Sequence, residues 1–457
     1  RGTGMGLIRT VSGVRGVVGR DLDAQVVYRY VQAFAAIQPA GPVLLVRDSR
    51  PHGAELLTAA NKALQTVRRP VIIADLAPTP TAQFIVPRKH LAGAIVLTAS
   101  HNPIEYNGLK FIGSDGCFLD AEQTAVLFAR ADQIEAPSEI PSRRPRSKVL
   151  LDVIGLHILD TLNLSCIDAE AILRKRFKVV VDTVNGAASF ALPTLLEALG
   201  CEVIRLHTTP DGTFPRGAEP LPENLTDLCR AVTENGACIG MATDPDADRL
   251  ALVDETGTAP GEELTQVLAV DGFLRRTGSR RPVTTNLSSS MLLDHVAGRY
   301  GIEVVRSAVG EINVVLMMRS VGGEIGGEGN GGVILAESHL GRDSLVGAAL
   351  VLDRLAQEAL PLSAILAQLP QFCMIKEKVA IDGHDTDEVL RRIAERYPDA
   401  ESITLDGLKL QWPDKWMHVR KSNTEPVIRI HAEAPTREAA QELAAEVREL
   451  VGIERTG

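Results

Sequence analysis

The chain has 457 residues, of which 45% are hydrophobic and 23% are charged, and its formal net charge at pH 7 is −10. A chain of this length is too long for one hydrophobic core, so we expect several domains, and the composition excludes a disordered or fibrous protein. The negative charge repels nucleic acids and anionic membranes, so an anionic substrate must be held by locally clustered arginines and lysines.

Short apolar and β-branched runs alternate with helical patterns along most of the chain, which predicts α/β domains with largely buried sheets. The expected strands lie at 43–46, 71–73, 94–97, 179–181, 201–206, 238–241 and 250–253, and the expected helices lie at 24–37, 54–67 and 191–199. The segment 135–148 contains three prolines and four basic residues without apolar periodicity, so we expect it to be a surface loop or linker.

The last part of the chain, from about residue 371, has a different pattern. A strand at 373–381, a helix at 386–396, strands around 403–410 and 427–432, and a helix at 437–451 predict a compact α+β unit. We therefore expect four domains, at residues 5–150, 151–256, 257–370 and 371–457.

The sequence offers no sign of secretion or membrane insertion. No apolar run reaches the roughly 20 residues that a membrane-spanning helix needs, and the N-terminus lacks a signal-peptide pattern. We therefore predict a cytoplasmic protein that binds neither membranes nor nucleic acids. The six cysteines are scattered without a C-x-x-C pair, which favours reduced thiols over zinc or disulfide frameworks.

Three carboxylates at alternate positions, Asp244, Asp246 and Asp248, directly follow a predicted strand. Carboxylates at this spacing can converge on one hard cation, and a set without Cys or His suits Mg²⁺ or Ca²⁺ rather than Zn²⁺. An EF-hand is disfavoured because Arg249 stands where that loop needs Gly and because the flanking segments are expected strands. The alternative is an acidic surface loop without a ligand.

Ser100 lies in the segment Thr98-Ala99-Ser100-His101-Asn102-Pro103, directly after the expected strand at 94–97. A hydroxyl at the end of a strand, beside an imidazole and upstream of Lys110, is a candidate nucleophile, although the same residue types also suit an ordinary turn. The G-x-S-x-G pattern of serine hydrolases is absent, which disfavours acyl transfer. A serine combined with a magnesium site indicates phosphoryl transfer instead.

Two further segments carry candidate binding groups. Arg420-Lys421-Ser422-Asn423-Thr424-Glu425-Pro426, followed by Arg429, can surround an anion with arginines, hydroxyls and loop amides, or can be a solvated turn. In Gly326-Gly327-Glu328-Gly329-Asn330-Gly331-Gly332, Glu328 and Asn330 can bond sugar hydroxyls, or the segment is simply a glycine-rich hairpin. A dinucleotide site is disfavoured there because no strand–turn–helix unit surrounds the glycines.

Taken together and in their order along the chain, the four segments resemble the α-D-phosphohexomutase superfamily over nearly the full length of the chain. Further matching segments are Ser12-Gly13-Val14-Arg15-Gly16, Arg47-Asp48-Ser49-Arg50, Pro78-Thr79-Pro80-Thr81, Val181-Asp182-Thr183-Val184-Asn185-Gly186 and Asp211-Gly212-Thr213-Phe214-Pro215. The resemblance implies three related mixed-sheet α/β domains and a smaller C-terminal α+β domain around a central cleft.

The resemblance also implies roles for individual residues. Ser100 would carry the phosphoryl group, and one Mg²⁺ per chain would be held by Asp244, Asp246, Asp248 and a phosphoserine oxygen. The reaction centre would include Arg15, His101, Lys110 and Arg249, with Lys110 moving the proton. Glu328 and Asn330 would read the sugar, and Arg420, Ser422, Asn423, Thr424 and Arg429 would hold the phosphate that is not reacting.

The implied reaction moves a phosphoryl group between O6 and O1 of a hexose phosphate through a hexose 1,6-bisphosphate, which would also act as activator. Three departures from common family patterns, Asn330, Gly332 and Ala308, resemble the phosphoglucosamine mutase-like branch. Phosphomannomutase or phosphoglucomutase activity is the alternative, and a magnesium-dependent sugar phosphatase or a non-catalytic relative is the alternative of another class. The sequence leaves open the preferred sugar, the oligomeric state and whether Ser100 is phosphorylated in the isolated protein.

Overall fold

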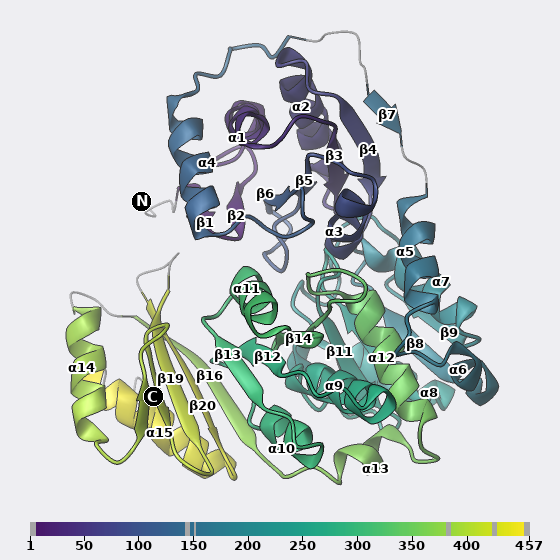
Figure 1. Cartoon of the computed structure of the whole chain (residues 1–457), viewed down its shortest axis with the longest axis vertical. Coiled ribbons are helices and arrows are strands. Elements are labelled where there is room, and N and C mark those ends of the chain that lie inside the picture. The colour runs from purple at the N-terminus through teal and green to yellow at the C-terminus, as the bar shows by residue number, and fades with distance from the viewer. Residues whose placement is uncertain (1–5, 142–146, 150–151, 381–384, 423–426, 452–457) are drawn as a thin grey trace.

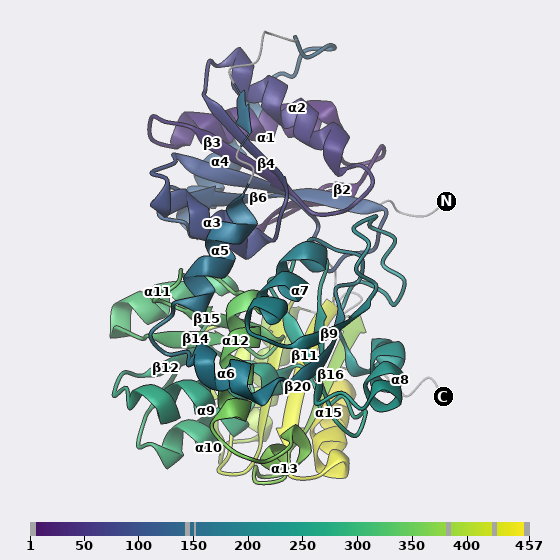
Figure 2. The ribbon, with the colours of Figure 1, turned by 90° about the vertical axis from the view of Figure 1, so that its right-hand side faces the viewer.

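The computed structural model describes residues 6–141, 147–149, 152–380, 385–422 and 427–451. They form four sheets, which define domains I to IV in chain order. Domain I lies at one end of the molecule, and the other three domains pack together at the other end (Figures 1 and 2). The architecture confirms the expected three α/β domains followed by a smaller α+β domain.

Domain I is built on a seven-stranded sheet with the order β1-β2-β6-β5-β3-β4-β7. Its strands are β1 Ile8–Thr10, β2 Gly13–Val17, β3 Val43–Arg47, β4 Val71–Leu76, β5 Gly93–Leu97, β6 Tyr106–Gly113 and β7 Ser147–Val149. Its helices are α1 Ala24–Ile37, α2 Gly53–Thr66, α3 Thr79–Arg88 and α4 Ala121–Gln133. Successive residues of β3 and β5 enter two different cores, one beneath α1, α2 and α4 and one beneath α3. Both faces are therefore covered, which explains the uninterrupted apolar runs of these strands.

One prediction about this domain was wrong at its end. Residues 147–149, of which the first two were expected in a linker, form β7, which pairs in parallel with β4 at the edge of the sheet. Backbone pairing with β4 makes these residues a strand, and this pairing leaves no apolar periodicity in the sequence.

Domains II and III repeat the central topology of domain I. Domain II contains β8 Lys178–Asp182, β9 Glu202–Leu206, β10 Ile239–Thr243 and β11 Leu250–Asp254, in the order β11-β10-β8-β9, with α7 Ala188–Ala198, η1 Pro222–Asn224 and α8 Thr226–Asn235. Domain III contains β12 Val283–Asn286, β13 Val304–Ser307, β14 Ile325–Glu328 and β15 Gly332–Leu335, in the order β13-β12-β14-β15, with α9 Glu263–Thr277, α10 Leu292–Arg299, α11 Glu311–Val321 and α12 Ser344–Ala356. In all three domains an antiparallel hairpin (β5/β6, β10/β11 or β14/β15) borders two parallel strands. Helices α5 Val153–Leu162, α6 Ala169–Lys175 and α13 Leu362–Leu366 complete this part of the chain.

Domain IV is a five-stranded antiparallel sheet with the order β16-β20-β19-β18-β17. Its strands are β16 Cys373–Ala380, β17 Glu401–Ile403, β18 Leu408–Gln411, β19 Trp416–Lys421 and β20 Val427–Ala434. Helices α14 Thr386–Arg396 and α15 Arg437–Val451 pack on one face of the sheet and enclose the core of this domain. Domains II and III instead share one continuous apolar core.

A buried histidine–aspartate cluster joins domain I to domain III. The Nε2 atoms of His157 on α5 and His339 lie 2.7 and 2.8 Å from one carboxylate oxygen of Asp343. The other oxygen of Asp343 accepts hydrogen bonds from the first amides of α12, and the His157 ring is hydrogen-bonded to Thr81 on α3. The cluster fixes the start of α12 against α3 and α5, next to the site described below.

The steric packing around Gly108 gives the first prediction. A Cβ at Gly108 on β6 would lie 2.3 Å from the carbonyl oxygen of Val14 and 2.8 Å from that of Thr98, so backbone must move to admit it. We expect Gly108→Ala to cost about 1–3 kcal/mol and to lower the unfolding temperature of domain I by several degrees in calorimetry.

The matched control is Gly298→Ala on α10, where an added Cβ meets nothing within 4 Å and alanine is the better helix former by about 1 kcal/mol. This variant should unfold at or above the wild-type temperature. A Gly108→Ala protein that unfolds at the wild-type temperature would contradict the packing argument.

Candidate active site

The three sequence motifs of domains I to III occupy equivalent places in the repeated topology. The serine loop (residues 98–105) joins β5 to β6, the aspartate loop (residues 244–249) joins β10 to β11, and the glycine loop (residues 329–331) joins β14 to β15. Each loop is the connection of the antiparallel hairpin in its own domain. Direct contacts between the domains, described next, bring the serine and aspartate loops and the glycine-loop hairpin together.

Ser100 adopts a conformation that non-glycine residues seldom take. Its φ is +51° and its side chain is buried, with Oγ 3.5 Å from Nδ1 of His101. The Ser100 amide donates to the Thr98 hydroxyl, which donates in turn to the Asp48 carboxylate. A strained residue held by buried partners is typical of functional loops.

Arg50 holds the backbone of the serine loop from behind. Its guanidinium is fully buried, pairs with Asp48 and donates to four carbonyl oxygens of the segment that begins at Ser100. These acceptors are the carbonyls of Ser100, Asn102, Pro103 and Tyr106, at 2.5–2.9 Å. Because one rigid fork binds all four carbonyls, the course of the loop is fixed independently of any ligand.

The aspartate loop has the features of a cation site. Asp244, Asp246 and Asp248 are fully buried, and one oxygen from each lies within 4.8 Å of the others. Ala247, between the last two, has φ +62°, a local reversal that lets neighbouring carboxylates converge. Asp244 Oδ2, Asp246 Oδ1 and Asp248 Oδ1 find no hydrogen-bond partner within the described ranges of the chain. Three buried and unsatisfied carboxylate oxygens fit a hard divalent cation.

Electrostatics supports the same interpretation. Burial, together with repulsion from Asp248 and Asp246, raises the pKa of Asp244 well above its usual value. The pKa of Asp248 is depressed despite its burial, because Arg342, Lys110 and Arg249 stabilise its charge. The three carboxylates therefore depend on nearby positive charge.

Domains I and III supply that charge. Lys110 on β6 donates to Asp246 at 2.6 Å and to Asp248 at 3.1 Å, and Thr79 at the start of α3 donates to Asp246 at 2.6 Å. Burial lowers the pKa of Lys110, but the two carboxylates outweigh it and raise the pKa above its usual value. From domain III, Arg342 donates to Asp248 at 2.7 Å.

A second cationic group surrounds the residue next to the serine. Arg249 donates to His101 Nδ1 at 3.1 Å, and Glu219 lies 3.3 Å from the other ring nitrogen. Burial and the charges of Arg249 and Arg15 hold the pKa of His101 well below its usual range, so the ring is neutral. Arg15 donates to Asn102, and burial lowers its pKa to about 10. Two half-buried arginines that contact the residues following Ser100 form a setting for a phosphoryl group.

In the glycine-loop hairpin, the side chains of Glu328 and Asn330 both have hydrogen-bond partners within the protein. Both carboxylate oxygens of Glu328 have protein partners: one accepts from Asn286 and the Gly310 amide, and the other accepts from Arg342. The Asn330 side chain accepts from the Gly332 amide in its own hairpin.

Domain IV provides a separate group of cations. On neighbouring strands, Lys378 of β16 is directly opposite Arg429 of β20, which is directly opposite Arg420 of β19. Asp406 lies 4.0 Å from Arg420, and like charges directly opposite one another destabilise a sheet, so the row is a candidate site for a further anion. Burial lowers the pKa of Arg420, and the positive charge of Arg429 lowers it further. Ser422 is buried beside this row, whereas Asn423 and Thr424 lie outside the described residues.

The structure thus brings Ser100, His101, Arg15, Lys110, Arg249 and the three aspartates together, and it places Arg420 and Arg429 in a second group. The sequence reasoning gave no individual role to Arg50, Thr79, Glu219, Arg342 or Lys378. Arg50 and Thr79 lay within matching family segments, which is a usable signal. The other three are brought in by tertiary contacts, for which a single sequence gives no pattern.

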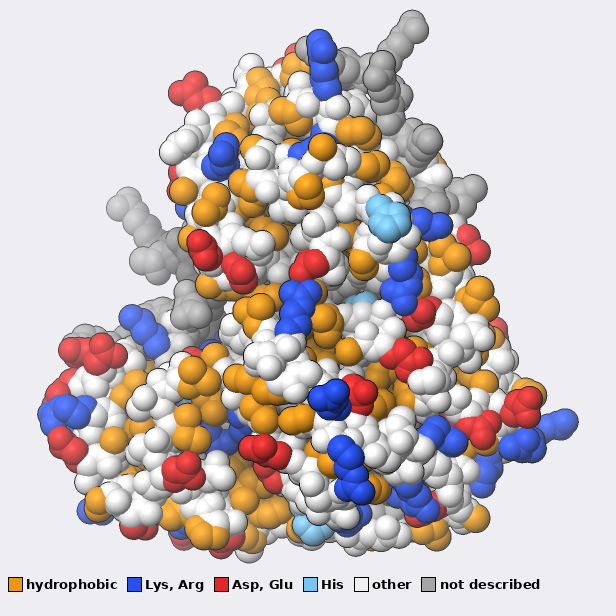
Figure 3. Space-filling model, in the orientation of Figure 1, with side chains coloured by type: hydrophobic (Ala, Val, Ile, Leu, Met, Phe, Trp, Pro, Cys, Tyr) orange, Lys and Arg blue, Asp and Glu red, His pale blue; other side chains and the backbone are white. Residues whose placement is uncertain are grey.

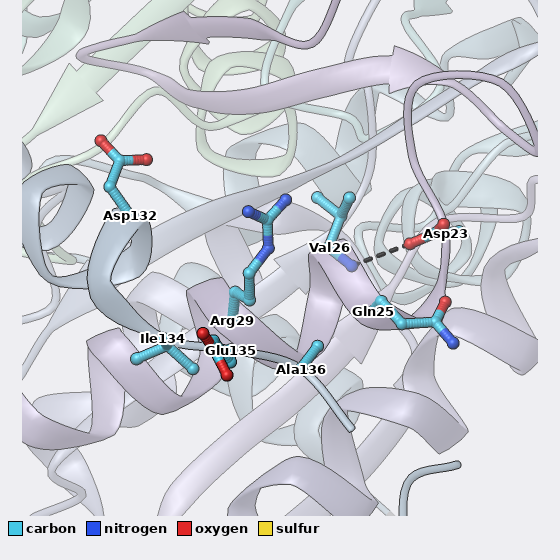
Figure 4. Close-up of a pocket in the computed structure, with 8 residues that line it drawn as sticks. All are labelled: Asp23, Gln25, Val26, Arg29, Asp132, Ile134, Glu135 and Ala136. Atoms are coloured by element: carbon cyan, nitrogen blue, oxygen red, sulfur yellow. Dashed lines mark hydrogen bonds between the residues drawn. The ribbon is translucent and has the colours of Figure 1, made fainter. Parts of the chain in front are cut away.

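Other surfaces add little to this site. A hollow lined by α1 and the end of α4 (Figure 4), with Arg29 and Asp132 on its sides, shares no residue with the motifs. On the face shown in Figure 3, acidic and basic side chains are intermixed. Over the described parts of the chain, no helix combines the length and apolar character needed to cross a membrane.

Family comparisons agree with this architecture. Models of phosphoglucomutase/phosphomannomutase α/β/α domains I, II and III match residues 7–138, 157–257 and 260–372, and the model of the C-terminal domain matches residues 376–450. The chain is 36% identical over 455 residues to a Methanopyrus kandleri protein named "Probable phosphoglucosamine mutase", covering 98% of each. It is also 36% identical to a phosphoglucomutase/phosphomannomutase of Thermococcus kodakarensis, covering 96% of this chain and 97% of the relative.

Solved structures show the same fold. A phosphoglucomutase/phosphomannomutase family protein of Burkholderia thailandensis has a TM-score of 0.81 and 27% identity, with 97% of this chain and 98% of that chain covered. An Aspergillus fumigatus N-acetylphosphoglucosamine mutase, solved with GlcNAc-6P and magnesium, has a TM-score of 0.60 at 15% identity, with coverage of 97% and 95%. With all four domain models matched in order, the chain belongs to the phosphoglucomutase/phosphomannomutase family and is an enzyme of the α-D-phosphohexomutase superfamily.

Proposed function

We propose that the chain interconverts the 6-phosphate and 1-phosphate of a hexose, with Ser100 as the phosphoryl carrier and a hexose 1,6-bisphosphate as intermediate. The observation that carries the proposal is the joining of the serine and aspartate loops: Lys110 and Thr79 of domain I donate to Asp246, and Arg249 donates to His101 beside Ser100. A hydroxyl, a cation site and clustered arginines are the parts that phosphoryl transfer needs.

The unsatisfied oxygens of Asp244, Asp246 and Asp248 would hold one Mg²⁺ together with a phosphoserine oxygen. When bound, the ion neutralises charge on the transferring phosphoryl group. Arg249 and Arg15 would stabilise the same group from the side of His101. Lys110, the buried amine between two of the aspartates, is our candidate for exchanging a proton between Nζ and the sugar hydroxyl.

The cation row of domain IV would hold the phosphate at the other end of the sugar. Arg420, Ser422, Asn423, Thr424 and Arg429 are the proposed ligands, and Lys378 joins them because it is directly opposite Arg429. Glu328 and Asn330 would contact sugar hydroxyls between the two phosphate sites. Two separate anion sites are what a substrate that becomes a bisphosphate requires.

Glucosamine phosphate is our preferred substrate, with mannose and glucose phosphates as the alternative. The relatives from M. kandleri and Sulfurisphaera tokodaii are named for amino sugars, whereas the T. kodakarensis relative is named for glucose and mannose. The A. fumigatus mutase was likewise solved with magnesium and GlcNAc-6P, the phosphate of an amino sugar. The competing activity is that of a sugar phosphatase, in which water instead of the sugar accepts the phosphoryl group.

Replacement of the proposed carrier tests the central claim. Wild-type protein with Mg²⁺ and glucose 1,6-bisphosphate should convert glucosamine 6-phosphate to the 1-phosphate, and Ser100→Ala should reduce the rate by about 1,000-fold or more. Phosphate on Ser100, detected in the wild type by intact mass and peptide mapping, should be absent from the Ser100→Ala variant. Ser320→Ala, on the exposed surface of α11, is the control and should retain both. Release of inorganic phosphate without any 1-phosphate would establish the phosphatase instead.

Removal of one aspartate tests the cation site. In chelator, Asp244→Asn should unfold at or above the wild-type temperature, because one of three mutually repelling buried carboxylates is neutralised. The rise in unfolding temperature that Mg²⁺ gives the wild type should be lost. The exposed Asp227→Asn control should keep that rise, and an undiminished Mg²⁺ effect in Asp244→Asn would refute the assignment.

Truncation in the domain IV row tests the second phosphate site. Arg420→Ala removes charge-assisted hydrogen bonds worth about 1.5–3 kcal/mol, so KM for the sugar phosphate should rise about 10-fold to 100-fold. Phosphorylation of Ser100 by acetyl phosphate, which lacks the sugar, should change little. Arg391→Ala, on the exposed side of α14, serves as control. An unchanged KM for Arg420→Ala would place the second phosphate elsewhere.

A further inference from the structure

One arginine outside the sequence motifs connects the aspartate loop to strand β14 and to helix α11. Arg342 lies two residues before α12, is 8% exposed, and places its guanidinium between three carboxylates. Its Nη2 donates to Asp248 at 2.7 Å, its Nη1 to Glu328 at 3.0 Å and its Nε to Glu311 at 3.0 Å. The three acceptors belong to the aspartate loop of domain II, the end of β14 and the first residue of α11.

The second oxygens of the three carboxylates differ in their surroundings, and the Arg342 guanidinium is a donor that all three carboxylates share. The second oxygen of Glu311 accepts from Gln83 of domain I, and the second oxygen of Glu328 accepts from Asn286 and Gly310. The second oxygen of Asp248 is one of the unsatisfied atoms that face the proposed cation. Arg342 therefore fixes one oxygen of Asp248 while leaving the other available to a metal ion.

The backbone of domain III is shaped to admit this side chain. A Cβ at Gly332 would lie 2.2 Å from Cδ of Arg342 and 2.7 Å from its Cγ. The arginine stem thus fills the space that a side chain at position 332 would need. Gly332, one of the departures from common family patterns, has a physical reason in this contact.

We propose that Arg342 is a positioning residue that couples the cation site to the sugar-binding hairpin, so that Mg²⁺ and sugar phosphate each strengthen the binding of the other. The inference rests on the proposed function of the two sites. An outer-shell partner of a metal ligand typically contributes about 10–100-fold to metal affinity. Sugar binding at Glu328 and metal binding at Asp248 both act on one guanidinium, and such coupling is reciprocal.

A second buried arginine shows what a merely structural role looks like. Arg354, further along α12, is 2% exposed and pairs with Asp271 and Glu358. Neither partner belongs to a motif loop, so Arg354 is a matched control for the loss of a buried arginine.

The test measures binding rather than turnover. Isothermal titration of unphosphorylated wild-type protein with Mg²⁺ should give a tighter Kd in the presence of glucosamine 6-phosphate than in its absence. Arg342→Gln should weaken Mg²⁺ binding about 10-fold or more and abolish the effect of the sugar phosphate. Arg354→Gln should lower the unfolding temperature but leave the Mg²⁺ affinity within about twofold of wild type and keep the coupling.

A steric variant protects the test against misfolding of Arg342→Gln. Gly332→Ala keeps every charge but displaces the arginine stem, and it should reduce the coupling in the same way. A folded variant of either kind with wild-type Mg²⁺ affinity and coupling would overturn the inference, as would independent binding of the two ligands to the wild type. Coupling that depends on Arg342 in a protein that forms no hexose 1-phosphate would uphold the inference and reject the proposed function.

Discussion

The repulsion among Asp244, Asp246 and Asp248 is the constraint on which the rest of the site depends. Two unit charges 4 Å apart repel by about 4 kcal/mol at an effective dielectric constant of about 20, and here three are buried together. Folding supplies Lys110 from domain I and Arg342 from domain III as partial compensation, so the loop of one domain draws stabilising charge from both neighbours. Electrostatic balance at the aspartate loop thus ties three domains into one site.

The repeated topology explains how loops from different domains arrive at that site. In each of the first three domains the motif lies in the connection of the antiparallel hairpin, beside two parallel strands. One backbone plan therefore presents a hydroxyl, a carboxylate cluster and a polar hairpin from equivalent positions. A different feature fixes each loop. Arg50 holds the backbone at Ser100, Ala247 adopts a left-handed conformation between two aspartates, and the Arg342 stem packs against Gly332.

Local signals in the sequence predicted some of the helices and strands correctly, whereas strands such as β1, β2 and β7 were missed. The helices expected at 24–37 and 386–396 match α1 and α14, since apolar periodicity agrees there with N-caps at Asp23 and Asp385. Helix α7 begins three residues earlier than expected, because its first turn reverses the usual pattern: Ser189 is buried and Phe190 is exposed. Contacts such as Arg342 to Asp248, 94 residues apart, depend on tertiary packing that no local pattern encodes.

The way domain IV is attached bears on the proposed reaction, in which a bisphosphate must reverse between two ends of one site. Domains II and III share an apolar core, whereas domain IV has its own core and meets domain III through polar contacts. Glu433 accepts from Ser290 and the Met291 amide, and His418 is hydrogen-bonded to Ser288. Such bonds exchange with water at a net cost of only about 1 kcal/mol each, while separating an apolar core exposes its whole area. Displacing domain IV would therefore break polar contacts with domain III without dividing an apolar core.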